Sequence, residues 1–394
     1  MTFRLFAYTF DGICVIMVAV LLQQYVIGPA TARITTVKEC PRTAVSLTDL
    51  CIGAQVYAVG KWILWRWWKS RDGKQDSIYG LEHGRLHLQA PTPMWMNMGH
   101  WGDGKTRKPM AKACRDLLKA VLAEAGFSNE EERAGNAKAN GRRRTLIDLG
   151  FGCGDQTIYL MSETPVRPQD RDWWDAREYC VKFDYYVGIT KDPLQACYAN
   201  DSVDKLHAET VTSSGHDVGV ISLVCADAAS PASWNNQVKR RIDNALKDSP
   251  DCWMLALDTA YHFSPSRWPV IQYAHTQLRA SFMAFDLCLS PSATITQKLV
   301  LRVLTAFMGA PWANFSTMDE YKQKLVEVGY SADAIKIVDI SEHVFTPLAC
   351  YLAEQDSRLK MMGLGIGTFS VAKSLFAWWG RSSVIRGVIV VARR

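Results

Sequence analysis

The sequence predicts an α/β fold in which a mostly parallel sheet of seven strands is flanked by helices. Of its 394 residues 48% are hydrophobic, which is enough for a sizeable packed core. Short apolar runs alternate with helical stretches from residue 145 onward, the pattern of a doubly wound sheet. A glycine-rich turn follows the first of these runs. The predicted strands are Thr145–Leu149, Tyr185–Ile189, Val218–Cys225, Cys252–Asp258, Ala280–Leu287, Ile335–Ile340 and Val384–Ala392.

The N-terminal region, residues 1–90, carries features of membrane contact. Residues 12–28, GICVIMVAVLLQQYVIG, have about the minimum length that spans a bilayer. We interpret them as a membrane anchor; a buried core helix and a cleaved signal peptide, with Ala30-Thr31-Ala32 as its site, are alternatives. The basic residues after this segment predict that the larger C-terminal part faces the cytosol, at the endoplasmic reticulum or a similar membrane.

A second segment, residues 48–70, is predicted to be a helix that contacts the membrane. Its Trp-rich part, residues 56–70, mixes indole rings with basic side chains, both of which favour the lipid headgroup layer. The alternative is a Trp-rich patch that packs on the α/β domain. The segment Gly367–Arg381 repeats the aromatic and basic pattern. We therefore divide the chain into a membrane-associating region, 1–90, and an α/β domain, 91–394.

Charge and cysteine content exclude several classes of partner. The formal net charge of +6 is mild for this length, and we expect no nucleic-acid partner. The 11 cysteines form no C-x-x-C pair, so the spacing fits neither a zinc site nor a disulfide framework. We expect reduced thiols and no metal.

Helices and loops around the strands follow from local patterns. Residues 111–126 have helical periodicity, and the polar stretch 128–144 is predicted to be a solvated loop. Another loop is expected at 165–182. Thr317 and Glu320 have the spacing of a capping box, which predicts a helix directly after Thr317.

The glycine-rich turn reads D-x-G-x-G-x-G, with Asp148 followed by Gly150, Gly152 and Gly154. Glycine allows sharp turns and the close approach of a ligand. The dinucleotide pattern G-x-G-x-x-G would place its third glycine where Asp155 stands, and an acid there repels a phosphate. The turn suits a cofactor with an amino-acid tail, whose ammonium group Asp148 receives.

This turn resembles motif I of the class I S-adenosylmethionine-dependent methyltransferases, which have a Rossmann-like fold. The segment VGITKDPLQ resembles one of their branches, which holds cyclopropane fatty-acid synthases, tocopherol and sterol C-methyltransferases, and sugar and macrolide O-methyltransferases. The resemblance implies that Thr190 and Gln195 contact the adenosine part; a polar turn with a helix cap is the alternative. The sequence departs from the branch at Lys191 and Asp192, and we expect Asp192 to cap a helix.

The next strand is followed by Asp227 and Ala228 in the segment VCADAAS. The resemblance implies an acid beside the adenine amino group at Asp227 and a backbone amide from Ala228. A solvated loop aspartate is the alternative. Further upstream, MWMNMGHWGDG resembles the element that closes over the cofactor in this branch, with Trp101 and His100 over the methionine end.

The segment LALDTAYHFSPSRW resembles the Tyr-His-Phe element of the macrolide and sugar O-methyltransferases. That resemblance implies catalytic roles for Tyr261 and His262, with Asp286 as a second polar residue of the site. A neutral imidazole takes a proton from an alcohol near neutral pH, and a carboxylate orients it. A lone histidine after a strand is, alternatively, structural.

The resemblance, which covers residues 94–394, implies methyl transfer from S-adenosylmethionine to a lipophilic small molecule. We expect a hydroxyl acceptor with His262 as general base. Methylation of carbon in a sterol-, prenyl- or acyl-type lipid is an alternative, as is a non-catalytic partner subunit. Whether the chain forms a homo-oligomer stays open at this point.

Overall fold

A computed structural model describes residues 93–104, 108–127, 143–161, 183–213, 219–247, 249 and 251–394. The chain divides into two compact units, Met1–Glu82 and His83–Arg394, and the described residues all belong to the second. The proposed membrane segments at 12–28 and 56–70, and nearly all of the two predicted loops, lie outside the described residues. Within the described part of the chain, no helix combines the length and apolar composition needed to cross a bilayer.

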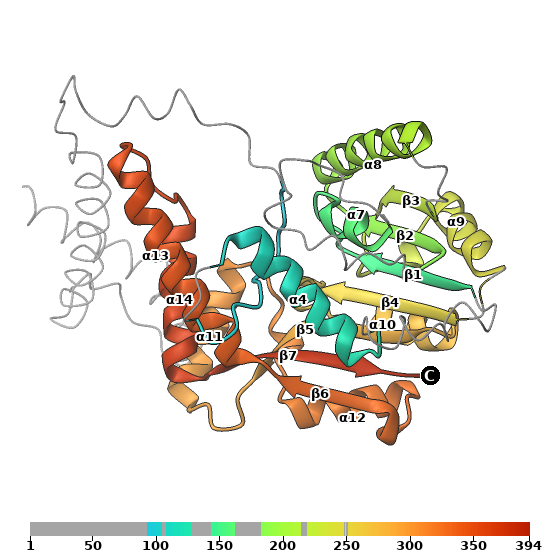
Figure 1. The fold of residues 1–394 in the computed structure, drawn as a ribbon. Coiled ribbons are helices and arrows are strands. Elements are labelled where there is room, and N and C mark those ends of the chain that lie inside the picture. The colour runs from blue at the N-terminus through green and yellow to red at the C-terminus, as the bar shows by residue number, and fades with distance from the viewer. Residues whose placement is uncertain are drawn as a thin grey trace, which may run out of the picture. The chain divides into compact units, whose positions relative to one another are not determined.

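The core of the second unit is one seven-stranded sheet with the strand order β3-β2-β1-β4-β5-β7-β6 (Figure 1). Strands β1 to β5 pair in parallel, and β7 runs antiparallel to both of its neighbours. The sequence prediction of seven mostly parallel strands is confirmed, with each strand boundary within two residues. The strands are β1 (Arg144–Leu149), β2 (Tyr185–Thr190), β3 (Val220–Cys225), β4 (Asp251–Leu257), β5 (Ser281–Leu289), β6 (Ile335–Asp339) and β7 (Ile385–Ala392).

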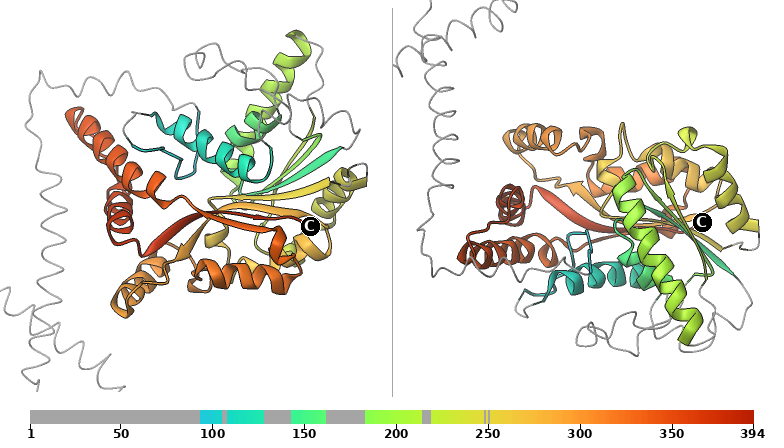
Figure 2. Two further views of the ribbon diagram at one scale, coloured as in Figure 1. Left: turned by 60° about the horizontal axis from the view of Figure 1, so that its bottom comes forward. Right: turned by 90° about the horizontal axis from the view of Figure 1, so that it is seen from above.

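Helices cover both faces of the sheet because alternate residues of each strand point to opposite faces (Figures 1 and 2). One core lies between the sheet and α4 (Met110–Glu124), α7 (Asp155–Met161), α8 (Pro193–Ser213), α11 (Ile295–Phe307), α13 (Phe345–Met361) and α14 (Phe369–Ser382). The other core lies between the opposite face and α9 (Asn236–Lys247), α10 (Trp268–Thr276) and α12 (Met318–Val328). The chain therefore forms three layers, helix, sheet and helix.

Two helix starts have the side-chain caps that the sequence predicts. Thr317 and Glu320 form the capping box of α12, each side chain bonding the other residue's backbone N–H. Asp192 Oδ1 accepts the N–H groups of Leu194 and Gln195 at 2.9 and 3.2 Å, which caps the first turn of α8. The predicted helix at 111–126 is confirmed as α4, shifted by one or two residues.

The segment Gly367–Arg381 is part of a helical pair rather than a uniformly exposed strip. It forms most of α14, which packs along α13 (Figure 1). Trp379 is fully buried, with its ring 5.4 Å from that of Phe345. Part of the aromatic pattern that suggested membrane contact therefore belongs to the core.

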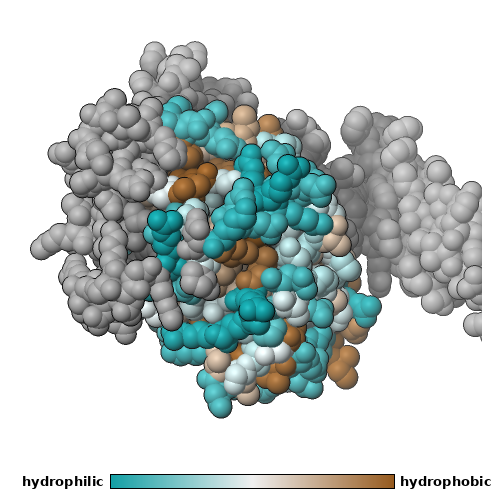
Figure 3. All heavy atoms as spheres, turned by 90° about the vertical axis from the view of Figure 1, so that its right-hand side faces the viewer, coloured by the Kyte–Doolittle hydropathy of each residue, from teal (hydrophilic) through white to brown (hydrophobic). Residues whose placement is uncertain are grey.

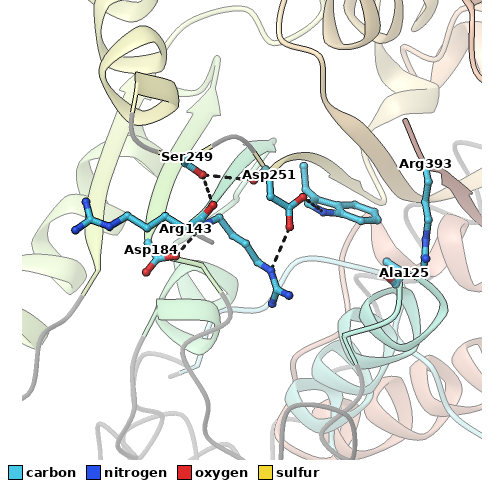
Figure 4. A network of polar contacts seen from close by, with 8 residues as sticks. Ala125, Arg143, Asp184, Ser249, Asp251 and Arg393 are labelled. Carbon is cyan, nitrogen blue, oxygen red and sulfur yellow. Dashed lines mark hydrogen bonds and ion pairs between the residues drawn. The ribbon is translucent and has the colours of Figure 1, made fainter. Parts of the chain in front are cut away.

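The amino ends of the parallel strands are joined by ordinary polar contacts (Figure 4). The backbone N–H of Arg144 donates to Asp184, and its guanidinium pairs with Asp251 at 3.2 Å. Ser249 Oγ donates to the carbonyl of Arg143 at 2.8 Å. Figure 3 looks onto this end of the sheet, where hydrophilic side chains cover most of the described surface. These contacts align the strand starts, and the candidate site lies at the other end.

Candidate active site

The site is built at the carboxyl ends of the parallel strands, starting with the glycine turn between β1 and α7. Gly150, Gly152 and Gly154 all have positive φ, at 79°, 65° and 91°, a conformation that favours glycine. At Gly150 a Cβ would lie 2.7 Å from Thr259 Oγ1, so this glycine also lets the turn approach the loop after β4. The sequence prediction of a tight glycine turn is confirmed.

Asp148, near the end of β1, is fully buried. Tyr186 and Gln156 both donate to its Oδ2, the latter at 2.6 Å, whereas Oδ1 has no hydrogen-bond partner among the described residues. Burial raises the pKa of Asp148 to about 6, and the two donors oppose that rise. A buried carboxylate oxygen with no partner is costly unless a ligand or water supplies a donor.

A small pocket lies in front of the glycine turn, between it and the segment at residues 94–97. Among the described residues that line it, the only charged one is acidic, Asp155, and none is basic. Asp155 Oδ2 accepts the backbone N–H of Met94 at 3.0 Å, which fixes the segment across the turn. The full lining is Met94, Trp95, Met96, Asn97, Gly150, Phe151, Gly152, Cys153, Asp155, Gln156 and Leu257.

Asp258 joins this segment to the loop after β4. Its Oδ2 accepts the backbone N–H of Met98 at 2.6 Å, and its Oδ1 accepts the hydroxyl of Tyr261 at 3.0 Å. Its backbone has φ +60°, which is uncommon for a residue other than glycine. Burial raises the pKa of Asp258 to about 7, opposed by these two hydrogen bonds. Asp258 therefore connects the front of the pocket with the Tyr-His-Phe segment.

The residues predicted to contact adenosine lie after β2 and β3. Thr190 is buried, and its hydroxyl donates to Gln195 Oε1 at 3.2 Å. Asp227 is exposed, and its Oδ1 accepts the backbone N–H of Ala229 at 3.0 Å. Ala228 is buried. Because β2 pairs in parallel with β1 and β3 pairs in parallel with β2, all of these residues lie at the same edge of the sheet as the glycine turn. Their contact with adenosine stays a prediction.

His262 ends a short helical turn, Ala260–His262, directly after β4. Its ring is half-buried and lies 4.3 Å from the Tyr261 ring, centroid to centroid. Burial lowers the pKa of His262, while a backbone hydrogen bond with Gly309 opposes the change. The imidazole is therefore mostly neutral near pH 7, as a general base requires.

A buried asparagine holds this histidine segment in place. Asn314 Nδ2 donates to the carbonyls of Tyr261 and Phe263, at 3.0 and 2.8 Å, on either side of His262. Asn314 Oδ1 accepts the backbone N–H of Arg267 at 2.9 Å. One side chain thus makes three hydrogen bonds to the backbone that carries His262.

Asp286, predicted as a second polar residue of the site, lies inside β5 and is fully buried. It pairs with the guanidinium of Arg267 and accepts the hydroxyl of Tyr321 at 3.0 Å. Its other oxygen accepts the backbone N–H of Leu287 at 2.8 Å. Burial raises the pKa of Asp286, and the Arg267 guanidinium opposes that rise. Both carboxylate oxygens already have partners within the core, and a direct catalytic role for Asp286 stays a prediction.

Trp101 and His100, predicted to cover the cofactor, lie next to the helical pair. Trp101 is buried against Tyr351, with ring centroids 4.7 Å apart, and its indole N–H donates to the carbonyl of Met98. His100 contacts His343, with ring centroids 4.9 Å apart. These contacts fix the chain that follows residues 94–97, and the contact of Trp101 and His100 with a cofactor stays a prediction.

Several site residues were not identified from the sequence. Gln156 and Tyr186 hold Asp148, Asp258 joins the front segment to the histidine loop, and Asn314 holds that loop. Asp258 had a usable signal, since it directly follows a buried strand. The others had none, because their partners are distant in sequence or belong to ordinary helix and strand patterns.

No protein-family model and no curated protein matches the sequence. Among solved structures, the chain is similar to the cyclopropane synthase MmaA2 from Mycobacterium tuberculosis, with 14% identity, a TM-score of 0.47, and coverage of 76% of this chain and 90% of the other. It is similar to the mycolic acid cyclopropane synthase CmaA1 at 12% identity and a TM-score of 0.45, over 80% and 95% of the two chains. It is also similar to the geranyl diphosphate C-methyltransferase from Streptomyces coelicolor A3(2), with 13% identity and a TM-score of 0.36. The match covers 70% of this chain and 84% of the other.

Identities this low, with TM-scores below 0.5, carry no argument about what this chain does. The fold rests instead on its own sheet. Seven mostly parallel strands with helices on both faces fit the Rossmann-like methyltransferase fold that the sequence motifs predict.

Proposed function

We propose that the protein is an enzyme that transfers a methyl group from S-adenosylmethionine to a lipophilic small molecule. The observation that carries the proposal is the electrostatics of the pocket at the glycine turn. Among the described residues that line the pocket, Asp155 is the only charged one, and Asp148, which the lining residue Gln156 contacts, has a buried oxygen without a partner in the described part of the chain. The acidic side chains there disfavour a phosphate, whereas a ligand with an ammonium and a sulfonium group is attracted. Trp95 and Phe151 in the lining add aromatic faces, which also favour cations.

The residues present fit this cofactor. The backbone of the glycine turn, which carries no Cβ at three positions, would receive the amino-acid tail, and Asp148 would receive its ammonium group. Thr190, Gln195 and Asp227, with the amide of Ala228, would contact the adenosine part. When bound, S-adenosylmethionine supplies a methyl group on a positively charged sulfur, which an electron-rich atom can accept.

His262 would act as the general base for a hydroxyl acceptor. Its lowered pKa keeps the imidazole neutral, so a ring nitrogen can take the proton of the hydroxyl group. Asn314 fixes the backbone on both sides of His262. The ring of Tyr261, whose hydroxyl donates to Asp258, packs against the His262 ring. Much of the rate would come from holding the acceptor and the base in a fixed geometry.

We further propose that residues 12–28 and 56–70 hold the enzyme at a membrane, with the α/β domain in the cytosol. A lipophilic acceptor would be concentrated there. The apolar length of the first segment and the Trp-rich, basic composition of the second support this proposal.

Calorimetry of the purified protein with S-adenosylmethionine tests the cofactor. Binding is expected, and NAD should not bind because the pocket repels its pyrophosphate. Absence of S-adenosylmethionine binding would end the proposal. The acceptor can then be sought by incubating lipid extracts with a donor that carries a deuterated methyl group. Mass spectrometry of the product tells an O-methyl ether from a C-methylated sterol-, prenyl- or acyl-type lipid.

His262→Ala tests the base. Turnover should fall by about 10²-fold or more, the usual range for general-base catalysis, with cofactor affinity unchanged. His275→Gln, on α10 and packed against Tyr330, is the matched histidine control and should keep full turnover. Unchanged turnover in His262→Ala would remove this residue from the mechanism.

A further inference from the structure

Helix α11 exposes a row of large apolar side chains. Ile295, Leu299 and Val303 are 80%, 60% and 57% exposed and lie four residues apart, which places them on one face of the helix. Val300 beside them is 46% exposed. Leu301, on the opposite side, is fully buried in the core. The helix therefore has two apolar faces, and only one of them is covered.

The last residue of α13 and the first turn of α14 expose a second apolar group. Met361, Phe369 and Val371 are 60%, 62% and 69% exposed. Figures 1 and 2 show α11, α13 and α14 at the same end of the sheet, the end reached by the carboxyl ends of the parallel strands. We call the exposed residues of these three helices the apolar–basic end.

The charges at this end are mainly positive: the three helices carry six basic side chains and two acidic ones, Glu354 and Asp356, and Glu354 pairs with Arg358 at 3.0 Å. No acidic residue lies between Asp286 and Asp319, a stretch that contains all of α11 with Lys298 and Arg302. No acidic residue follows Asp356 in the chain. By contrast, the opposite end of the sheet mixes acids and bases (Figure 4).

Asp356 itself does not cancel this charge. Lys360 and Lys373 pair with the same carboxylate oxygen, at 2.8 and 2.9 Å. Hydrogen bonds from these two lysines lower the pKa of Asp356 to about 2, so it stays ionised. Two positive charges share one negative charge, and a net positive charge remains at the end of the helical pair.

We propose that the apolar–basic end is a docking surface for an anionic lipid bilayer. Exposed apolar side chains gain free energy when they enter the acyl boundary, and each nearby lysine or arginine adds attraction to anionic headgroups. A second copy of this surface would bring like charges together. The chain's own N-terminal region would do the same, because Arg33, Lys38 and Arg42 lie between its two apolar segments and Lys61, Arg66 and Lys69 lie in the second. This proposal concerns the described domain itself and does not depend on methyl transfer.

Hydrogen exchange of the full-length protein tests the surface residue by residue. Samples are compared without vesicles, with phosphatidylcholine vesicles, and with vesicles that also contain phosphatidylserine. Protection of residues 295–304 and 358–375 is expected only with the anionic vesicles. Equal exchange in all three samples, or equal protection by the neutral vesicles, would overturn the proposal.

The same experiment excludes the other occupants. Protection that is present without vesicles and grows with protein concentration would mean a second copy covers the surface. Protection without vesicles at every concentration would mean that another part of the chain covers it. Either result overturns lipid docking.

Variants connect the protection to the named side chains. The double substitution Leu299→Asp/Val303→Asp should abolish protection by anionic vesicles, because two charges would have to enter the acyl boundary. Lys298→Glu/Arg302→Glu should weaken it severalfold. The matched control is Val326→Asp, an exposed valine of α12, which should leave the protection unchanged. Protection that survives in the first two variants would overturn the proposal.

Discussion

Asp148 and Asp286 are both fully buried carboxylates near the carboxyl ends of central strands, yet their surroundings differ. Asp286 has Arg267 as a counter-charge, and all its oxygens are bonded. Within the part of the chain that the structure describes, Asp148 has neutral donors only, and one of its oxygens has no partner. A carboxylate whose two oxygens both have hydrogen-bond partners in the core stabilises the fold. A carboxylate with one unpartnered oxygen can accept a hydrogen bond from a ligand.

The comparison also separates two residues that the sequence grouped together as site candidates. Both follow or lie within apolar runs, and both match positions of the same methyltransferase resemblance. Their roles can be told apart only by what surrounds them. The substitutions below test this difference, from the largest expected effect to the smallest.

Asp286→Ala should lower the free energy of unfolding by about 3–5 kcal/mol, because it leaves the Arg267 guanidinium buried without a counter-charge. Urea unfolding measures this loss. The double variant Asp286→Ala/Arg267→Met should recover much of it, since no buried charge remains. If Asp286→Ala stays as stable as the natural protein but loses turnover, Asp286 is a catalytic residue after all.

The stability that Asp148 contributes should fall as pH rises, because folding raises the pKa of its carboxyl group. Its folded pKa of about 6 lies above the ordinary value of 3.8 for an aspartate. The folded state therefore binds more protons between about pH 4 and pH 6, and stability falls as pH rises through that window. Asp148→Asn removes the effect while keeping an oxygen for Tyr186 and Gln156.

Thermal unfolding at several pH values measures the difference between this variant and the natural protein. A rise in pKa from 3.8 to about 6 corresponds to about 3 kcal/mol. Between about pH 4 and pH 7, the free energy of unfolding of Asp148→Asn should therefore increase by about that amount relative to the natural protein. A difference that is constant across this range would show that Asp148 titrates as it does in the unfolded chain.

Asp148→Asn should also weaken S-adenosylmethionine binding by about 10- to 100-fold, the effect of losing one hydrogen bond to a charged partner. Calorimetry at pH 8 measures it, where the natural residue is ionised. Asp227→Asn is a useful comparison, because its carboxylate is exposed and its loss should matter less. Unchanged affinity in Asp148→Asn would assign the unpartnered oxygen to a structural water.

The strands and caps could be predicted because their causes are local. The apolar runs around Ile147 and Val187 define their strands without knowledge of the rest of the fold, and Asp192 caps α8 through residues two and three positions away. The partners of the buried polar groups could not be predicted in this way. Arg267 reaches Asp286 only because β4 and β5 are neighbours in the sheet.

Asn314 illustrates the same limit most clearly. It lies in a short turn whose sequence, WAN, has no motif, and its bonds reach residues about 50 positions earlier. Only the folded chain brings these groups together. The role of Asn314 therefore follows from geometry alone, and it can be tested as such.

Asn314→Ala should reduce turnover by about tenfold, equivalent to about 1.4 kcal/mol of transition-state stabilisation, because His262 loses its fixed backbone. Cofactor affinity should be unchanged. As the segment opens to water, the pKa of His262 should rise toward its ordinary value, so the acidic limb of the pH–rate profile should move to higher pH.

The matched control for Asn314→Ala is Ser249→Ala. Ser249 is also buried and also bonds a distant backbone carbonyl, but at the opposite end of the sheet (Figure 4). It should lose some stability and keep both its turnover and its pH–rate profile. If Asn314→Ala behaves in the same way, Asn314 only stabilises the fold; a displaced acidic limb in Asn314→Ala alone identifies it as the residue that positions the base.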